Sequence, residues 1–348
     1  MIVCSGATDR LLPVSGWNLA GCYSLGGAQV ALKSQACAIG GAVVFLGTGP
    51  LLYLVSSQYV KAGANVVAVL DTAPLSARLA ALPDLVTLPD LLLTGARLTW
   101  QLKRAGIPVL SGVTPLAIEG DPQGGVQRIC IRTASGRERT FDCDAIGMGW
   151  HLRPETQIAD LARCEFAFDP LTRQWLPVTD RDGRASAPGI YLAGDGARVL
   201  GARAAEVTGE LAALAALEDL GLTVDRDRQY WLRAARQDYA TFARGLARAF
   251  PWPDDLAAQV SDETVVCRCE AVTAGTLRSS IAECGAGEAN RAKAFSRVGM
   301  GRCQGRYCGN AAAEIIRAAR GQDIALAGRL RGQAPVKPIA VGSVRTDA

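Results

Sequence analysis

The chain has 348 residues, 49% of them hydrophobic, which is enough for two or three packed globular domains. Its single histidine, His151, excludes a Rieske centre, which needs two histidines, and an HExxH zinc site. The net charge of +4 comes entirely from residues 259–348, with 13 Lys and Arg against 8 Asp and Glu. These arginines lack interleaved aromatic residues, so we do not expect nucleic acid as a partner.

The N-terminus and the apolar segments indicate a cytoplasmic protein. Residues 1–10 show no basic region followed by an apolar run, as a secretory signal would. The longest apolar stretch, residues 42–55, is interrupted by Gly47, Gly49 and Pro50 and is shorter than the roughly 20 residues of a membrane helix. We therefore expect no membrane span.

Residues 41–71 have the pattern of a βαβ unit. The run AVVFL from residue 42 is a buried strand, residues 47–50 are a glycine turn, and residues 51–62 have helical periodicity that ends at Gly63. A second buried strand, NVVAVL, then ends at Asp71. This order is typical of a Rossmann-like domain.

The same unit is a candidate dinucleotide site. Such sites use a glycine turn to bring backbone N–H groups to a pyrophosphate, and an acidic residue about 20 positions later to bind a ribose hydroxyl. Gly47, Gly49 and Asp71 have these positions, although Leu52 stands at the third glycine position. The sequence leaves open NAD(P) binding here or a unit that binds nothing.

Short strands follow the βαβ unit. Residues 107–112, 126–134 and 139–148 alternate with turn-forming segments, and we interpret them as a β-meander that closes a nucleotide-binding domain. The glycine-rich segment at 147–154 then leads into another domain, with His151 as a surface or loop residue.

A second glycine site lies at residues 189–195, GIYLAGD. This segment predicts a buried strand that ends at Gly194 and Asp195, and residues 202–220 predict a long helix. An aspartate at this position in flavoproteins with two dinucleotide-binding domains binds the ribityl chain of FAD. A turn aspartate that caps the helix is the alternative. Residues 226–258 then predict a charged helical connector.

Four cysteines have the spacing of a metal centre. Cys267 and Cys269 form one pair, and Cys303 and Cys308 form the other after 33 intervening residues. A [2Fe-2S] cluster needs four thiolates, two per iron, which two pairs can supply. Structural zinc is the rival, but it usually uses C-x2-C pairs. Helices are predicted beyond both pairs, and nearby glycines leave backbone amides free to bond the sulfurs.

The remaining cysteines lack ligand spacing. Cys284 lies at the predicted end of a helix, and we interpret the other six as packing residues. They are Cys4, Cys22, Cys37, Cys130, Cys143 and Cys164.

The motifs resemble those of a known family. CRCE at 267–270 and GMGRCQGRYCG at 299–309 resemble the bacterioferritin-associated-ferredoxin-like (BFD-like) [2Fe-2S] domain. Residues 5–33, with GTGPLL, GIYLAGDGAR and APVKPI, are similar to the α subunits of heteromeric flavin-dependent amino-acid dehydrogenases. That group includes opine oxidases, proline and D-hydroxyproline dehydrogenases, sarcosine-oxidase-like complexes and hydrogen cyanide synthase.

The resemblance implies an α/β fold with two dinucleotide-binding domains and a small helical [2Fe-2S] domain. The implied divisions are a remnant of the FAD-binding domain (1–40), an inserted NAD(P)-binding-like Rossmann domain (41–146), the C-terminal part of the FAD-binding domain (147–225), a helical connector (226–258), the BFD-like domain (259–321) and a tail (322–348). Family members begin with a strand and a GxGxxG loop for FAD upstream of the segment with which this chain starts. We therefore expect an N-terminally truncated chain that retains the cluster more readily than FAD.

The resemblance also implies a function. The chain would be an electron-transferring FAD/[2Fe-2S] subunit, with Asp195 contacting FAD and the four cysteines ligating the cluster. An amino-acid-oxidase-like β subunit would oxidise the C–N bond of a secondary amine, opine or hydroxyproline, and a small ferredoxin-like γ subunit could take part. The alternatives are a truncated, non-catalytic iron-sulfur scaffold or assembly subunit and an NAD(P)H-dependent flavin reductase.

Overall fold

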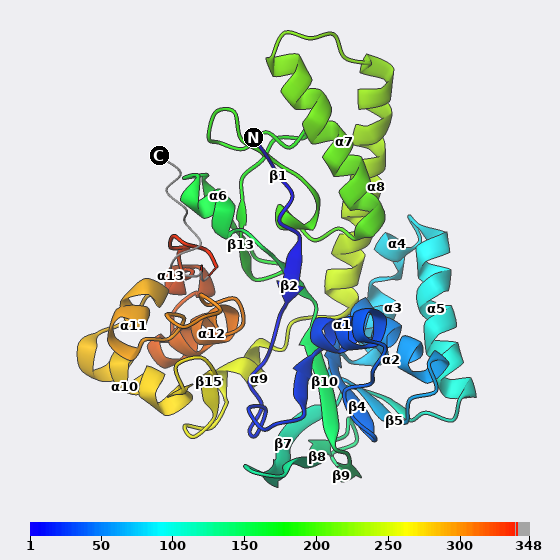
Figure 1. Cartoon of the computed structure of the whole chain (residues 1–348), viewed down its shortest axis with the longest axis vertical. Helices are drawn as coiled ribbons and strands as arrows, with labels where there is room; N and C mark the ends of the chain where they lie inside the picture. The colour runs from blue at the N-terminus through cyan, green and yellow to red at the C-terminus, as the bar shows by residue number, and fades with distance from the viewer. Residues whose placement is uncertain (338, 340–348) are drawn as a thin grey trace, which may run out of the picture.

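The computed structural model describes residues 1–337 and 339, so the last part of the predicted tail lies outside the described residues. Figure 1 shows three parts: a sheet-centred body, a helical hairpin of residues 202–249 above it, and a small helical domain in orange and red beside it. The small domain contains all four predicted cluster cysteines, and it lies against the body over residues that are distant in sequence.

A five-stranded parallel sheet forms the centre of the body, in the order β3-β10-β4-β5-β6. Its strands are β3 (Cys22–Ser24), β4 (Val43–Thr48), β5 (Val66–Asp71), β6 (Val109–Ser111) and β10 (Ala145–Trp150). Every residue of β4 and β10 is buried, because both faces of the sheet are covered.

Helices cover one face of this sheet. They are α1 (Leu25–Gln35), α2 (Pro50–Lys61) and α5 (Pro89–Arg104), whose apolar side chains share a core with Val43, Phe45 and Val69. The predicted βαβ unit of residues 41–71 is confirmed as β4, α2 and β5.

An antiparallel sheet covers the other face. It consists of β7 (Thr114–Asp121), β8 (Gly125–Arg132) and β9 (Glu138–Asp142), and it shares a core with Val44, Leu46 and Trp150 of the parallel sheet. The predicted meander was therefore partly wrong. Residues 109–111 and 145–150 belong to the parallel sheet, and β7 was not predicted.

Short strand pairs connect the start of the chain to residues 150–193. β1 (Ile2–Val3) pairs in parallel with β14 (Tyr191–Leu192), and β2 (Ala7–Asp9) pairs antiparallel with β11 (Leu152–Pro154). The hairpin of β12 (Phe166–Asp169) and β13 (Gln174–Pro177) and the short helix α6 (Gln157–Leu161) complete this part. The strand predicted over residues 189–195 is thus shorter than expected, and Gly194–Gly196 form a 3-10 turn.

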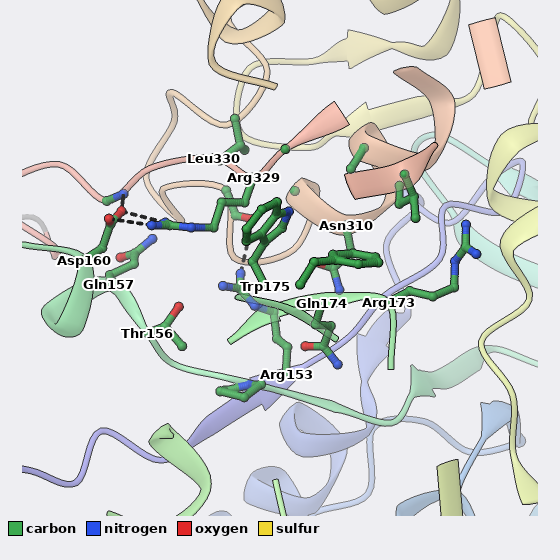
Figure 2. Close-up of a pocket in the computed structure, with 18 of the residues that line it drawn as sticks. Arg153, Thr156, Gln157, Asp160, Arg173, Gln174, Trp175, Asn310, Arg329 and Leu330 are labelled. Carbon is green, nitrogen blue, oxygen red and sulfur yellow. Dashed lines mark hydrogen bonds and ion pairs between the residues drawn. The ribbon is translucent and has the colours of Figure 1, made fainter. Parts of the chain in front are cut away.

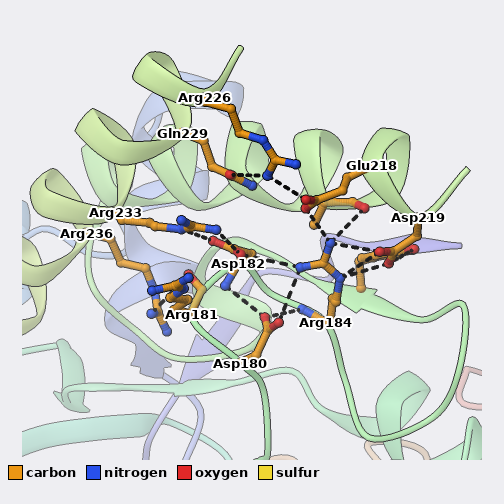
Figure 3. A network of polar contacts seen from close by, with 12 residues as sticks. Asp180, Arg181, Asp182, Arg184, Glu218, Asp219, Arg226, Gln229, Arg233 and Arg236 are labelled. Carbon is orange, nitrogen blue, oxygen red and sulfur yellow. Dashed lines mark hydrogen bonds and ion pairs between the residues drawn. The ribbon is translucent and has the colours of Figure 1, made fainter. Parts of the chain in front are cut away.

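Two long helices form the hairpin. α7 (Ala202–Asp219) packs along α8 (Arg226–Ala249), and α8 also contacts α3 (Leu75–Ala80) and α4 (Leu82–Leu85) of the body. A network of charged side chains anchors the hairpin to the loop before β14, as Figure 3 shows. Arg233 donates two bonds of 2.6 Å to the buried carboxylate of Asp182, and Arg184 bonds Asp219 at 2.8 Å. The predicted connector therefore also packs against the body, through the contacts of α8 with α3 and α4.

The small domain has its own apolar core. Its elements are β15 (Val265–Cys267), β16 (Val272–Thr273), α10 (Ala274–Cys284), α11 (Ala289–Ser296), α12 (Gly309–Arg320) and α13 (Ile324–Ala327), reached from α8 through α9 (Asp254–Ala258). Both predicted helices are confirmed. Thr273 caps α10 by accepting a bond from the Thr276 amide, and Gly321 ends α12 in the left-handed conformation.

Among the described residues, none of the helices combines the length and apolar character that a bilayer crossing requires.

Candidate functional site

The four predicted ligand cysteines meet in one place. Cys267 ends β15, Cys269 lies in the turn that follows, and Cys303 and Cys308 flank the loop that leads into α12. The Cys308 side chain lies close enough to those of Cys267 and Cys303 for each to shift the pKa of the other, and Cys303 is related to Cys269 in the same way. The two pairs, separated by 33 residues in sequence, therefore form one connected set of sulfurs.

Backbone amides surround two of these sulfurs. The amides of Gly299 and Glu270 bond Cys267, and those of Gly305 and Tyr307 bond Cys303. Such bonds stabilise negative charge on sulfur. The sequence-based expectation that glycines free amides for the sulfurs is met by Gly299 and Gly305, whose φ angles of 81° and 76° suit glycine.

The same contacts favour deprotonation. The bond from Cys308 and those from the amides lower the pKa of Cys267 to about 6 and that of Cys303 to about 5. The pKa of the Cys308 thiol is raised, because it hydrogen-bonds two neighbouring sulfurs and is buried. Metal ligands are thiolates, so the site offers two readily ionised sulfurs as the first ligands.

The loop that precedes α12 and carries Cys303 and Cys308, here called the cysteine loop (residues 299–308), packs tightly against Cys269. A Cβ at Gly301 would overlap the Cβ of Cys269, so only glycine fits there. In the part of the chain that the structure describes, no set of three His, Cys, Asp or Glu side chains already has the spacing of a metal site. The four cysteines lie together as free thiols, and a cluster would be held by iron–sulfur bonds to them. Four thiolates with amide donors fit a [2Fe-2S] cluster.

Exposure differs among the four cysteines. Cys267 and Cys308 are buried, Cys303 is half-buried and Cys269 is exposed. One edge of the site thus faces the domain core and the other faces the surface, which suits electron exchange with a partner. Of the six cysteines interpreted as packing residues, Cys22, Cys143 and Cys164 are buried and Cys130 is half-buried, but Cys4 and Cys37 are exposed, so for these two the interpretation was wrong.

The cluster domain is docked on the body through polar and aromatic contacts. Trp17 Nε1 donates to the Val265 carbonyl at 2.5 Å, and the Arg268 guanidinium lies 5.1 Å from the Trp17 ring centre. Arg173 forms two bonds of 2.8 Å with the buried carboxylate of Glu314 on α12. Since Val265 is two residues from Cys267, these contacts hold the cysteine site close to the body.

A cavity lies along this contact, between residues 153–175 of the body and residues 304–332. Figure 2 shows Arg153, Gln157, Trp175 and Asn310 around it. Three buried polar atoms of its lining have no partner among the described residues: Gln157 Oε1, Trp175 Nε1 and Asn310 Nδ2. The cavity is therefore a polar seam beside the cysteine loop, of the kind that ordered water commonly fills.

Gly194 and Asp195 lie where β14 ends, as predicted. Asp195 Oδ1 accepts bonds from the amides of Leu200 and Gly201 at 3.0 and 3.2 Å, and these amides lead into α7. Gly194 has a φ of 62°, and its amide bonds Thr208 Oγ1 at 3.0 Å. Both amides precede the first residue of α7, so Asp195 closes the turn before this helix and does not bond the amides of its first turn, as the alternative interpretation required. No described residue donates to its Oδ2 atom.

Gly47, Gly49 and Asp71 are also brought together, but the chain itself fills the space around them. Asp71 is fully buried and bonds Thr48 Oγ1, Tyr53 OH and the Ala73 amide at 2.7–2.8 Å, and Arg78 at 2.5 Å. Both of its oxygens are used. The surroundings raise the pKa of Asp71 by burial, against the opposing effect of the Arg78 charge and these bonds.

The glycines of this turn are required by packing. A Cβ at Gly47 would overlap the Gly149 carbonyl oxygen on the neighbouring strand, and one at Gly49 would lie 3.2 Å from His151 Nδ1. His151 lies in a loop, as expected, but it is half-buried, and its Nε2 bonds the Phe250 carbonyl at 2.5 Å. Burial lowers the pKa of His151 to about 4.

Comparison with known proteins identifies the families to which these parts are similar. Residues 1–216 match the pyridine nucleotide-disulphide oxidoreductase family, and residues 265–318 match the BFD-like [2Fe-2S] binding domain. An opine oxidase subunit from Rhizobium meliloti is 37% identical over 345 residues, which cover 97% of this chain and 64% of that protein. This chain thus spans less than two thirds of the length of that relative.

Two further relatives extend the comparison. The corresponding opine oxidase subunit from Agrobacterium tumefaciens is 39% identical, with 97% of this chain and 68% of that protein covered. Hydrogen cyanide synthase subunit HcnB from Pseudomonas aeruginosa is 30% identical, with 97% and 74% covered. Among solved structures, L-proline dehydrogenase from P. horikoshii superposes with a TM-score of 0.70 at 18% identity, over 99% of this chain and 58% of that one, which shows a shared fold.

Proposed function

This chain belongs to the pyridine nucleotide-disulphide oxidoreductase family and carries a BFD-like [2Fe-2S] binding domain, and from this premise we propose that it is the electron-transferring subunit of a heteromeric flavin-dependent dehydrogenase. The observation that carries the proposal is the set of four facing cysteines, with amide donors and one exposed edge, docked on the flavoprotein fold. A [2Fe-2S] cluster held there would accept and release one electron at a time.

The chain's own residues would prepare this site in three ways. Cys267, Cys269, Cys303 and Cys308 would supply the thiolates. The amides of residues 270, 299, 305 and 307 would stabilise the negative charge on sulfur. Trp17 would hold the site against the body through the Val265 carbonyl.

FAD is the second cofactor of the proposal. The turn at Gly194–Gly196 lies between β14 and the N-terminus of α7, and Asp195 Oδ2 receives no bond from the described residues. We assign Asp195 to a ribityl hydroxyl of FAD, with Gly194 allowing the close turn. Replacement of Asp195 by Ala should weaken FAD retention without affecting the cysteine site, as measured by the flavin and iron content of the same preparation.

The substrate is proposed to be oxidised on a partner chain. The relatives are named as subunits of an opine oxidase and of hydrogen cyanide synthase, so we propose an amino-acid-oxidase-like β subunit as partner, and a small ferredoxin-like γ subunit as a further one. The proposed substrate class is a secondary amine, opine or hydroxyproline-type amino acid. We place the assembly in the cytoplasm.

The proposal is tested by delivering electrons from a substrate. The chain is purified without oxygen together with a candidate amino-acid-oxidase-like β subunit, and a panel of opines and secondary amino acids is added. Oxidation of the amine to an imine releases two electrons and two protons, and the proposed flavin would accept the electron pair. The cluster would then accept one electron, which should appear as the EPR signal of a reduced cluster on this chain. A cluster that dithionite reduces, but that no substrate of the panel reduces in the complex, would favour the scaffold alternative.

A further inference from the structure

The loop between Cys303 and Cys308 is held by a short segment of the body. Gln157 Nε2 donates to the Gln304 carbonyl at 2.7 Å, and Arg153 donates to the Arg306 carbonyl at 3.0 Å. Figure 2 shows Arg153 and Gln157 on the body side of the polar seam. Residues 153–157 thus bind nearby peptide groups of the cysteine loop, although about 150 residues separate the two segments.

An ion pair lies at the centre of this contact. Arg306 Nε donates to Glu155 Oε2 at 2.5 Å, and each side chain is only 11% exposed. The same guanidinium donates to the carbonyl of Cys303 at 3.2 Å and to that of Val336 at 3.0 Å. A positive charge inside the cysteine loop is therefore balanced by a carboxylate that the body supplies.

Glu155 is in turn connected to the Gly194–Gly196 turn, which we assigned above to FAD. Its amide donates to the Gly6 carbonyl at 2.9 Å, and Ser5 Oγ donates to its carbonyl at 2.5 Å. Ser5 lies directly against Gly196, where a Cβ would come within 2.5 Å of Ser5 Oγ. A continuous series of contacts therefore runs from the Gly194–Gly196 turn through Ser5 and Glu155 to Arg306 and Cys303.

We propose that Glu155 is a positioning residue that acts through Arg306. It would hold the cysteine loop against the body, and it would balance the positive charge beside the cluster. The inference rests on the proposed function, since it requires a redox cluster at the cysteines. A [2Fe-2S] cluster gains one negative charge on reduction, so an uncompensated Arg306 cation favours the reduced form. Because both side chains of the pair are largely buried, bulk solvent and salt screen this effect little.

The pair predicts shifts of opposite sign. Glu155→Gln removes a negative charge beside the cysteine loop and should raise the midpoint potential, whereas Arg306→Gln removes a positive charge and should lower it. The buried Arg153 cation, which also interacts with Glu155, is present in both variants. The double variant Glu155→Gln/Arg306→Gln removes both charges and should lie between the single variants, close to the unchanged protein. Arg306→Lys, which keeps the charge, should restore most of the potential lost in Arg306→Gln.

A matched control is available on the hairpin. Glu210 and Arg228 form a pair at 2.6 Å, but their side chains are 40% and 45% exposed, and the pair lies on α7 and α8. Glu210→Gln should leave the potential unchanged. Potentials are measured by EPR during a dithionite titration of the full chain, with iron content determined for each variant.

The outcomes separate this inference from the proposed function. A full chain that binds zinc, or shows no EPR signal on reduction, overturns the proposed function and the inference with it. A normal signal with shifts of the same sign in both single variants, or no larger than in Glu210→Gln, overturns the inference alone. If a variant fails to load iron, hydrogen exchange in the cluster-free chain decides. Faster exchange of residues 303–308 than in Glu210→Gln supports positioning by Glu155, and equal exchange contradicts it.

Discussion

Two regions contain closely spaced glycines, which have different roles in each. One is the Asp71 corner, formed by Gly47, Gly49 and Asp71, and the other is the cysteine loop. At Asp71 the glycines make room for the chain itself: for the Gly149 carbonyl and His151. In the cysteine loop, Gly301 makes room for Cys269, and amides of neighbouring residues face sulfur. The first region is saturated by internal bonds and the second offers groups to a cofactor. A glycine turn is therefore evidence for a cofactor site only when its donors and acceptors remain available.

The largest expected effect tests the claim that the cysteine loop offers its groups to a cofactor. Cys303→Ser removes the thiol that contacts both Cys308 and Cys269, so cluster binding should be abolished. Cys284→Ser is the matched control, because Cys284 is an exposed cysteine at the end of α10 in the same domain. Iron content and visible absorption measure the effect. Equal iron in both variants would remove Cys303 from the ligand set.

The second expected effect tests the claim that the bonds of Asp71 stabilise the fold. Asp71→Ala strips Thr48, Tyr53 and Arg78 of a buried partner and should lower the free energy of unfolding by about 3 kcal/mol. Asp90→Ala, which removes an exposed ion pair with Arg203, should cost far less, because solvent screens such a pair. Urea unfolding measures both. If Asp71→Ala were as stable as Asp90→Ala but abolished NADH binding, Asp71 would be a ribose ligand rather than an internal anchor.

A smaller effect tests the close fit in the cysteine loop. Gly301→Ala places a methyl group on the Cβ of Cys269, and overpacking of about 1–3 kcal/mol corresponds to roughly tenfold weaker cluster retention. Gly209→Ala, on α7 with open space around it, should retain the cluster fully. The rate of iron loss to a chelator compares the two variants. Identical rates would show that the loop relaxes without disturbing its ligands.

The smallest effect is a pH dependence at the Asp71 corner. His151 has a pKa lowered from 6.5 to about 4 by burial, so the unfolded chain binds more protons than the folded chain between these values. Stability should therefore fall by about 1 kcal/mol as the pH drops from about 7 to about 5.5. The variant His151→Gln lacks this contribution, and it should show a flatter profile over the same range in urea unfolding. Parallel pH profiles of the unchanged protein and His151→Gln would show that the His151 side chain is solvated in the folded chain, which would contradict this prediction.

Sequence patterns predicted the local elements well, for physical reasons. The runs AVVFL and NVVAVL are apolar throughout because both faces of the parallel sheet are covered, so β4, α2 and β5 appear at their expected places. Thr273 and Gly321 are helix boundaries that the sequence shows directly. The gathering of the four cysteines was predictable because two closely spaced pairs are the pattern that metal ligation would impose on the sequence.

Contacts between distant segments could not be predicted from the sequence in the same way. Phe250 covers His151 from 99 positions away, and Glu155 meets Arg306 across 151 positions. Neither pair has a periodicity or a motif. The internal bonds of Asp71 also escaped prediction, since Tyr53 and Arg78 are helical residues whose direction depends on packing. Such groups become visible only when the fold places them together.

The most direct measurement is the iron, acid-labile sulfide and zinc content of the chain purified without oxygen, followed by EPR of the dithionite-reduced sample. The account predicts iron and sulfide in equal amounts, two of each per chain, with a rhombic signal of a reduced [2Fe-2S] cluster that Cys303→Ser abolishes. A colourless chain with one zinc per molecule and no signal after reduction would contradict it.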